Sequence, residues 1–200
     1  LTAVDGRCTK QAQAIEEKLG KEAVFKETGS VIAPAWSINK IMWIKDNEPE
    51  IIKDADGNVY NAVTIGTQIW IKENLKTTKY ANGEPISNVT DIAAWTTLST
   101  GAYCDYENNA GNSSVYGNLY NWYAVKDGRK ICPAGWHVPS NDEWEVLANS
   151  LGGWTIAGGK LKETGLTHWN YPNTGANNET SFTALPGGYR NYDGPFYGII

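Results

Sequence analysis

The sequence lacks any apolar run near the roughly 20 residues of a membrane-spanning helix, so it predicts no membrane span. It also lacks a basic excess: 17 Lys and Arg stand against 22 Asp and Glu, a formal net charge of −5. Proteins that bind nucleic acids need a basic face for the phosphates, so we expect no nucleic-acid partner. No basic-then-apolar segment opens the sequence, and we expect no signal peptide in it.

Zinc-binding patterns are missing as well. The three cysteines, Cys8, Cys104 and Cys132, form no Cys-x-x-Cys pair, and the sequence has no His-x-x-x-His. An odd number of cysteines cannot be fully paired within one chain. Two possibilities therefore stay open: Cys104 and Cys132 form a bridge, or Cys132 is a free thiol.

A calcium loop of the EF-hand type is excluded by its spacing. The acidic run Asp54–Asn58 resembles the start of such a loop, but Val59 and Ile65 occupy the positions that require Gly and Glu. We therefore expect the run to form an Asx turn that opens a strand. Calcium bound elsewhere would need other oxygen donors. The residues that could supply them are more simply interpreted as parts of solvated loops. The candidates are Asp105, Glu107, Asn108, Asn109, Asn177, Asn178 and Glu179.

What the sequence does contain is glycine and large polar aromatics. The 200 residues include 21 Gly, 9 Trp and 11 Tyr, but only 3 Phe. Trp and Tyr combine an apolar body with a polar tip, so they suit both a core and a wet binding surface. With 41% hydrophobic and 20% charged residues, the chain is typical of a globular protein.

The character of the sequence changes near residue 52, which predicts two parts, 1–52 and 53–200. In the first part, alanines with Ile15 and Leu19 one turn apart predict a helix over Thr9–Leu19, stopped by Gly20. A second helix is expected over Pro34–Asp46, because Pro is favoured at the first helical position.

The second part predicts short strands and few helices. Strands are expected around Val59, Val63, Ile65 and 69–71, with a turn at Asn82-Gly83. The aromatic segment Tyr116–Val125 is expected to be a helix or a strand, with a helix favoured. After residue 153 we expect long ordered loops with short strands.

A further helix is expected over Asn141–Leu151. Ser140 can cap it, Glu143 stands at the spacing of a capping box, and Gly152-Gly153 ends it.

Several consecutive motifs of residues 54–200 resemble the Fibrobacter succinogenes major paralogous domain. They are Asp56-Gly57-Asn58-Val59-Tyr60, Gly66-Thr67-Gln68-Ile69-Trp70-Ile71-Lys72-Glu73-Asn74-Leu75, Gly117-Asn118-Leu119-Tyr120-Asn121-Trp122-Tyr123-Ala124, Cys132-Pro133-Ala134-Gly135-Trp136-His137-Val138-Pro139, Gly158-Gly159-Lys160-Leu161-Lys162 and Ala184-Leu185-Pro186-Gly187-Gly188-Tyr189-Arg190. The resemblance implies an exported, extracytoplasmic bacterial module without an enzyme site. It also implies an α+β fold like that of C-type lectins or sulfatase-modifying factors, although fold alone does not fix activity.

The family pattern continues with further strands after Gly-Gly-Tyr-Arg, so the resemblance implies a C-terminally truncated module. Those strands would contribute a cysteine that could pair with Cys132.

Residues 1–52 resemble an internal fragment of an FGGY-family sugar kinase, closest to xylulokinases. The resemblance rests on Asp5-Gly6-Arg7-Cys8, Thr28-Gly29 and the run 40–51. It implies that Asp5 and Arg7 are remnants of a sugar site. No counterpart of the ATP loops or the catalytic carboxylate is present, and phosphoryl transfer needs all of these parts together. We therefore expect a chimeric chain without kinase activity.

The remaining candidate chemistry lies at one cysteine–histidine pair and at the aromatic tail. Cys132 and His137 are close in sequence, but a packed histidine is the favoured interpretation over a catalytic one. The tail residues could stack on sugar faces or lie in the core. They are Trp169, Tyr171, Tyr189, Tyr192, Phe196 and Tyr197, with Arg190 among them. We expect a non-catalytic module that binds a glycan or a surface protein. A purely structural module is the first alternative, and a remnant of an FGGY kinase that phosphorylates a sugar is the second.

Overall fold

The computed structural model describes residues 51–198, together with Gln13 and Glu17. The chain divides into two units, residues 1–50 and 51–200, and the second unit carries the architecture described here. Gln13 and Glu17 are helical and exposed, and both fall within the helix expected near the N-terminus. The helix expected over Pro34–Asp46 lies outside the described residues.

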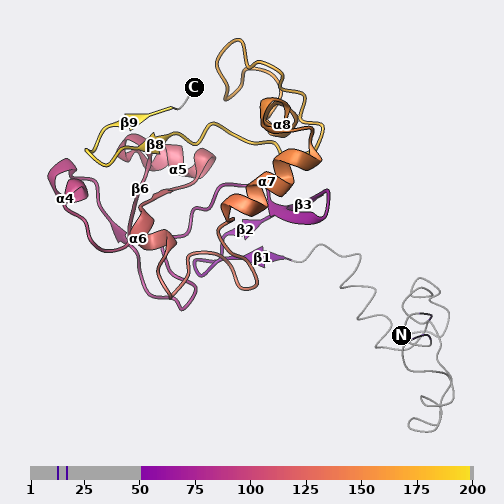
Figure 1. Ribbon diagram of the computed structural model, residues 1–200. Helices are drawn as coiled ribbons and strands as arrows, with labels where there is room; N and C mark the ends of the chain where they lie inside the picture. The colour runs from indigo at the N-terminus through magenta and orange to yellow at the C-terminus, as the bar shows by residue number, and fades with distance from the viewer. Residues whose placement is uncertain (1–12, 14–16, 18–50, 199–200) are drawn as a thin grey trace, which may run out of the picture. The chain divides into compact units, whose positions relative to one another are not determined.

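Residues 51–198 combine helices with short strands in an α+β arrangement (Figure 1). The strands are β1 (Ile52–Lys53), β2 (Val59–Tyr60), β3 (Ala62–Ile65), β4 (Gln68–Ile71), β5 (Ser87–Asn88), β6 (Ala102–Cys104), β7 (Leu119–Tyr120), β8 (Tyr189–Arg190) and β9 (Phe196–Tyr197). Strands β1–β2, β3–β4 and β8–β9 form antiparallel pairs. In the sheet β5–β6–β7, β5 and β6 are parallel and β7 is antiparallel to β6.

The helices are mostly short. They are α4 (Ile92–Thr96), the 3-10 helix η2 (Tyr106–Asn108), α5 (Ala110–Tyr116), α6 (Trp122–Val125), α7 (Asn141–Ser150) and α8 (Trp154–Leu161). Within the part of the chain that the structure describes, no helix has the length and apolar character that crossing a membrane requires.

The strands expected at the start of the module are confirmed, and so is the Asx turn that precedes β2. The carboxylate oxygen Oδ1 of Asp54 accepts hydrogen bonds from the backbone N–H groups of Asp56 (3.0 Å) and Asn58 (2.9 Å). The Tyr60 hydroxyl donates to Oδ2 of the same residue at 2.6 Å. Asp54 is buried, and these donors satisfy a carboxylate that would otherwise be costly to bury.

Helix α7 is confirmed almost residue for residue. The Ser140 hydroxyl accepts from the Glu143 backbone N–H (3.3 Å), while Glu143 Oε2 accepts from the Ser140 backbone N–H (2.7 Å), which completes the capping box. After the helix, the Gly153 N–H donates back to the Ala148 carbonyl at 2.8 Å. The buried side of the helix consists of Leu147, Ala148 and the following Leu151.

The single helix expected over Tyr116–Val125 is wrong. Helix α5 ends at Tyr116, strand β7 follows, and α6 starts at Trp122. Gly117 has φ +75°, and a Cβ at this position would lie 2.6 Å from the Leu75 carbonyl oxygen, so the chain turns here. The Asn121 side chain then caps α6 by accepting from the Ala124 N–H at 2.9 Å.

Helix α8 was also not expected, because its two glycines lower helix propensity. Tertiary packing stabilises it: Ala157 joins the buried residues of α7 in one apolar cluster. Gly159 is required by a close approach, since a Cβ there would lie 2.3 Å from the Gly175 carbonyl oxygen. The expectation of only loops and short strands after residue 153 is therefore wrong for this helix.

Three apolar clusters form the core of the module. The first joins the β3–β4 pair to α7 and α8 through Ile65, Trp70, Leu147, Ala148, Leu151 and Ala157. The second comprises Tyr80, Ile86, Ala124, Ile131 and Cys132, and the third comprises Trp95, Ala102 and Cys104. Phe196 of β9 packs against the third cluster, which ties the C-terminal hairpin to the core.

Candidate functional site

The β8–β9 hairpin presents three exposed tyrosine rings. Tyr189 and Tyr197 are cross-strand partners, so both side chains lie on the same face of the hairpin. Their ring centroids are 5.6 Å apart with an interplanar angle of 31°. The side chains are 55% and 47% exposed, and Tyr192 in the connecting turn is 83% exposed.

The other face of the hairpin is anchored by Arg190. Its guanidinium donates to the backbone carbonyls of Val89 (2.7 Å), Thr90 (2.9 Å) and Gly194 (3.0 Å). Arg190 also lies over the ring of Trp95, with 4.4 Å from Cζ to the ring centroid. Because Arg190 is 8% exposed and engaged in this way, we assign it to holding the hairpin and leave it out of the proposed binding surface.

Two glycines allow the hairpin to lie this close to the core. Gly188 has φ +62°, and a Cβ there would lie 2.5 Å from Cε2 of Tyr106. Gly194 has φ +107°, and a Cβ there would lie 2.5 Å from Cγ2 of Ile92. Any other residue at either position would combine backbone strain with a steric clash.

The two remaining aromatic candidates belong to a different loop. Trp169 is half-buried, and its indole N–H donates to the Ala184 carbonyl at 2.9 Å, while Lys162 Nζ lies 5.0 Å from the ring centroid. Trp169 is therefore held by the fold on its polar edge. Tyr171 is 85% exposed.

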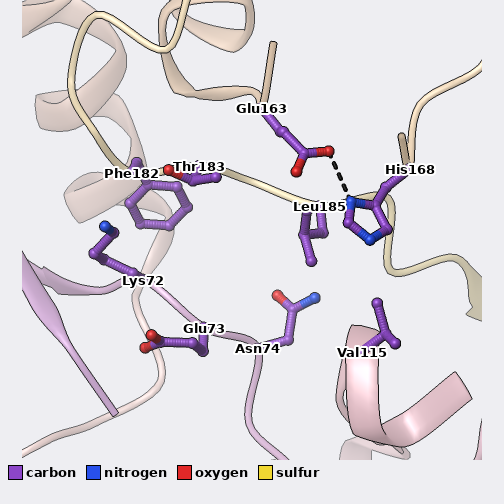
Figure 2. A pocket seen from close by; sticks show the side chains of 9 residues that line it. All are labelled: Lys72, Glu73, Asn74, Val115, Glu163, His168, Phe182, Thr183 and Leu185. Carbon is purple, nitrogen blue, oxygen red and sulfur yellow. Dashed lines mark hydrogen bonds and ion pairs between the residues drawn. The ribbon is translucent and has the colours of Figure 1, made fainter. Parts of the chain in front are cut away.

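A cavity of about 260 Å³ lies between the segment after β4, helix α5, the loop after α8 and the loop run 182–185 (Figure 2). It is lined by Lys72, Glu73, Asn74, Val115, Glu163, His168, Phe182, Thr183 and Leu185. None of these was among the site residues expected from the sequence. The available signal was weak: Lys72, Glu73 and Asn74 end one of the family motifs, and His168 is one of only two histidines.

One wall of the cavity carries a histidine–carboxylate pair. His168 Nδ1 lies 2.8 Å from Glu163 Oε2. The imidazole and the Tyr116 ring are perpendicular, at 89°, with 5.8 Å between their centroids. Both side chains are partly buried, with 27% and 20% exposure for His168 and Glu163. The pair is therefore held in place by contacts from the two sides.

The opposite wall of the cavity carries a second carboxylate, which is also engaged in hydrogen bonds. Glu73 accepts from the backbone N–H (2.8 Å) and side-chain amide (2.6 Å) of Asn61. Asn74 donates from Nδ2 to the Tyr116 carbonyl at 2.9 Å. Figure 2 shows the Asn74 amide and the Glu163 carboxylate turned toward the middle of the group of lining residues.

The cavity and the hairpin are neighbours along the chain. Leu185 lines the cavity, and a Cβ at Gly187 would lie 3.3 Å from Asn74 Nδ2. From Leu185 to Tyr189 the chain advances four residues, which span about 14 Å at most when fully extended. The exposed rings of the hairpin therefore begin a short distance from the cavity.

The two cysteines that the structure describes, Cys104 and Cys132, offer no activated nucleophile. Cys104 and Cys132 are both buried free thiols, so the structure contains no bridge between them. Burial raises the pKa of Cys132 to about 11 and also raises the pKa of Cys104 above its ordinary value. The packed histidine expected at position 137 is wrong: the His137 side chain is 69% exposed, because its ring turns to Glu143 at the start of α7, 2.7 Å from Nε2 to Oε1, and away from the core.

Most of the loop carboxylates and amides considered for calcium already have hydrogen-bond or ion-pair partners in the protein. Asn109 caps α5 by accepting from the Gly111 N–H (2.9 Å), and Asp105 accepts from the Ser113 hydroxyl. Glu179 pairs with Lys160 at 3.2 Å. Over residues 51–198, no three His, Cys, Asp or Glu side chains gather where they could hold a metal ion. The remnants of a sugar site, Asp5 and Arg7, lie outside the described residues.

Comparison with known families decides what this module is. The model of the Fibrobacter succinogenes major domain matches residues 63–199. The chain belongs to this family. A second family model, the N-terminal domain of the FGGY family of carbohydrate kinases, matches residues 1–110, so both resemblances found in the sequence are confirmed and the chain belongs to the FGGY family over this part.

The two matches share residues 63–110, and the kinase-like match therefore extends past the boundary expected near residue 52. No curated protein and no solved structure matches the chain. The α+β character is thus established by the structure itself, while the closer likeness to C-type lectins or sulfatase-modifying factors stays a prediction.

Proposed function

We propose that this Fibrobacter succinogenes major domain is a non-catalytic module that binds glycans through the outer face of the β8–β9 hairpin. The observation that carries the proposal is the group of Tyr189, Tyr192 and Tyr197, three rings that are all about half exposed or more. Flat rings with hydroxyl tips can stack on the C–H face of a sugar and hydrogen-bond to its hydroxyls. A solvent-exposed group of rings is otherwise unfavourable, and such patches mark interaction sites.

The anchoring of the hairpin supports this proposal, because it lowers the cost of binding. Ordering a mobile loop on association costs free energy that is lost from the affinity. Here two groups fix the hairpin in advance. The Arg190 guanidinium donates to four backbone carbonyls, and the indole N–H of Trp95 donates to the Asn191 carbonyl at 3.1 Å. The rings are thereby held ready for a ligand.

We further propose that the module works outside the cytoplasm, at the bacterial surface, where polysaccharides and surface proteins are the available partners. Membership of the family supports this placement. A surface protein is the second possible partner, and a module without a ligand of its own is the simplest alternative. Binding experiments on the tyrosines distinguish these possibilities.

Affinity electrophoresis in gels that contain soluble polysaccharides tests the proposal. We expect at least one neutral polysaccharide to retard the wild-type chain, and we expect Tyr189→Ala and Tyr192→Ala to migrate without retardation. Trp122→Ala is the matched control, since Trp122 is a 67% exposed ring on α6. Two results would contradict glycan binding by the hairpin: the tyrosine variants are retarded as strongly as the control, or no polysaccharide retards the wild-type chain.

A second candidate function follows from the match to the FGGY N-terminal domain, which favours phosphorylation of a sugar. The match covers only that domain, and the sequence shows no counterpart of the ATP loops and catalytic carboxylate that phosphoryl transfer requires. Purified protein incubated with ATP and a pentulose provides the test. ADP release above the rate of an Asp5→Asn variant would establish the kinase, and its absence leaves the binding module.

A further inference from the structure

We infer that the cavity in Figure 2 is a subsite for a single neutral sugar ring, adjoining the hairpin tyrosines that stack on the rest of the same glycan. This inference rests on the proposed function and names the ligand unit that the cavity receives. It concerns residues that neither the family matches nor the tyrosine surface assigns to binding.

The size of the cavity limits its occupant to about one ring. Its volume is about 260 Å³, just below the roughly 300–1,000 Å³ of pockets that enclose drug-sized ligands. A disaccharide would exceed this space, whereas a pyranose or furanose ring with its hydroxyls is of the matching order. The remainder of a longer glycan must therefore lie outside the cavity.

The lining has the mixed character that a sugar ring requires. Val115, Phe182 and Leu185 offer apolar contacts for the C–H groups of a sugar ring. Asn74 and Thr183 stand among them. Their donors are used within the fold, by Asn74 toward the Tyr116 carbonyl and by Thr183 toward the Ser181 carbonyl, so they offer neutral oxygen acceptors for the ring hydroxyls. Pockets that combine an apolar lining with a few converging polar groups are those that fix the orientation of a small ligand.

The charges of the lining favour a neutral occupant. Glu163 already pairs with His168, and Glu73 already accepts two hydrogen bonds from Asn61. Lys72 brings a positive charge to the same cavity. An anionic ligand would gain Lys72 but face two carboxylates, and a cationic one would gain those carboxylates but face Lys72, so a ligand of either sign meets a like charge in the lining. A polyol avoids this cost, because its hydroxyls can donate to a carboxylate and accept from an ammonium or amide.

The path from the cavity leads to the tyrosines. The run that starts with Leu185 at the cavity continues through Gly187, beside Asn74, to Tyr189 at the start of β8. Since Leu185 and Tyr189 are four residues apart, a glycan with one ring in the cavity needs to extend about 14 Å at most to reach the start of the hairpin. The cavity selects the sugar unit, and the hairpin adds contact area to its neighbours.

Proton NMR of the imidazoles tests the inference with an internal control. The chain has two histidines, and each is paired with a carboxylate: His168 lines the cavity, and His137 lies outside it with Glu143. Glucose, galactose, mannose, xylose and N-acetylglucosamine are titrated one at a time into the full chain, with glucuronate as the charged comparison. We expect a neutral sugar to move the His168 ring protons saturably and to leave those of His137 unchanged.

Filling the cavity provides the matched variant. Val115 is 45% exposed on α5, so Val115→Trp adds bulk at the cavity without replacing a buried side chain. Val146→Trp is the control, because Val146 is 48% exposed on α7 and does not line the cavity. We expect the sugar affinity measured at His168 to fall by about tenfold or more in the first variant, a change of about 1.4 kcal/mol, and to stay unchanged in the second.

The outcomes separate the cavity from the hairpin. If no neutral sugar moves His168, if both histidines move together, or if glucuronate alone binds, the inference is overturned. If that happens while polysaccharides still retard the chain through Tyr189, the cavity fails and the proposed function stands. If His168 responds to a sugar but the tyrosine variants are retarded like the wild type, the hairpin fails as the glycan surface, and with it the inference that cavity and hairpin share one ligand.

Discussion

Helix α7 and the β8–β9 hairpin are organised by different kinds of interaction. In α7, the residues that begin and end the helix are neighbours in sequence: Ser140 and Glu143 cap one end, and Gly153 bonds back to Ala148 at the other. In the hairpin, Arg190 reaches carbonyls about a hundred positions earlier in the chain, at Val89 and Thr90. Short-range rules therefore identify the helix, while only the folded structure reveals how the hairpin is held.

The same difference explains how the two faces of the hairpin divide their roles. Strand alternation turns Tyr189 and Tyr197 outward and their neighbours Arg190 and Phe196 inward. Neighbouring residues in sequence thus have different roles: Arg190 and Phe196 stabilise the fold, and Tyr189 and Tyr197 are exposed to ligands. Predictions about substitutions on the two faces should separate stability from retention on glycans.

The largest loss of stability is expected for Arg190→Ala. The change removes the donors of four backbone carbonyls and the cationic group that contacts the rings of Trp95 and Phe196. Hydrogen bonds to a charged group are worth about 1.5–3 kcal/mol each, and several are lost at once, so we expect the free energy of unfolding to fall by about 3–5 kcal/mol. Urea denaturation followed by Trp fluorescence measures it.

Arg190→Lys is the companion variant. An ammonium keeps the charge but cannot reproduce the planar fork of donors, so its stability should lie between that of the wild type and that of Arg190→Ala. If both variants unfold at the wild-type urea concentration, Arg190 does not anchor the hairpin, and the division into an inner and an outer face is wrong.

The next largest effect is expected for Gly194→Ala, which tests the turn of the hairpin. A methyl group at φ +107° and 2.5 Å from Ile92 should cost about 1–3 kcal/mol of stability. Gly128→Ala is the matched control, because it has a permissive backbone and no heavy atom within 4 Å of the added Cβ. Thermal unfolding of both variants should show a lowered midpoint for Gly194→Ala alone.

A smaller effect, and one that depends on pH, is expected in α7. The backbone N–H of Ser140, then His137 and the Ser140 hydroxyl, lower the pKa of Glu143 from 4.5 to about 2. Because the folded-state pKa is depressed, the stabilisation is present above pH 4.5 and is lost as the pH falls toward about 2. Glu143→Gln should therefore flatten the dependence of stability on pH in this window.

Glu145→Gln is the control for this measurement, since Glu145 is exposed on the same helix and takes no part in the capping box. Denaturant midpoints recorded between pH 2 and pH 6 should give the wild-type dependence for this control. The same flattening in both variants would show that the capping box is not the source of the acid sensitivity.

The helix α7, the Asx turn at Asp54 and the first strands could be predicted because each depends on residues close in sequence. The break at Gly117 could not, since it depends on the Leu75 carbonyl, which approaches from a distant segment. Helix α8 was missed for the same reason: its own glycines oppose a helix, and contact with α7 overrides them.

The candidate site was predictable only in part. The aromatic tail was visible in the sequence, and three of its tyrosines are indeed exposed on one hairpin. The burial of Arg190 and the packing of the Trp169 indole were not visible, because Trp, Tyr and Arg occur both inside proteins and on their surfaces. The cavity is lined by four segments that are distant in the chain, and no spacing of residues in the sequence predicts it.

The smallest change in stability and the largest change in binding should occur together in the double variant Tyr189→Ala/Tyr197→Ala. Both rings are about half exposed, so the loss of each side chain should lower the free energy of unfolding by well under about 1 kcal/mol. The contact between the two rings, which is also lost, is worth about 0.5–1.5 kcal/mol. Affinity electrophoresis on a polysaccharide that retards the wild type, run beside urea denaturation of the same preparation, tests the central claim most directly. The account predicts a folded variant that is no longer retarded; a folded variant that is retarded as strongly as the wild type would contradict it.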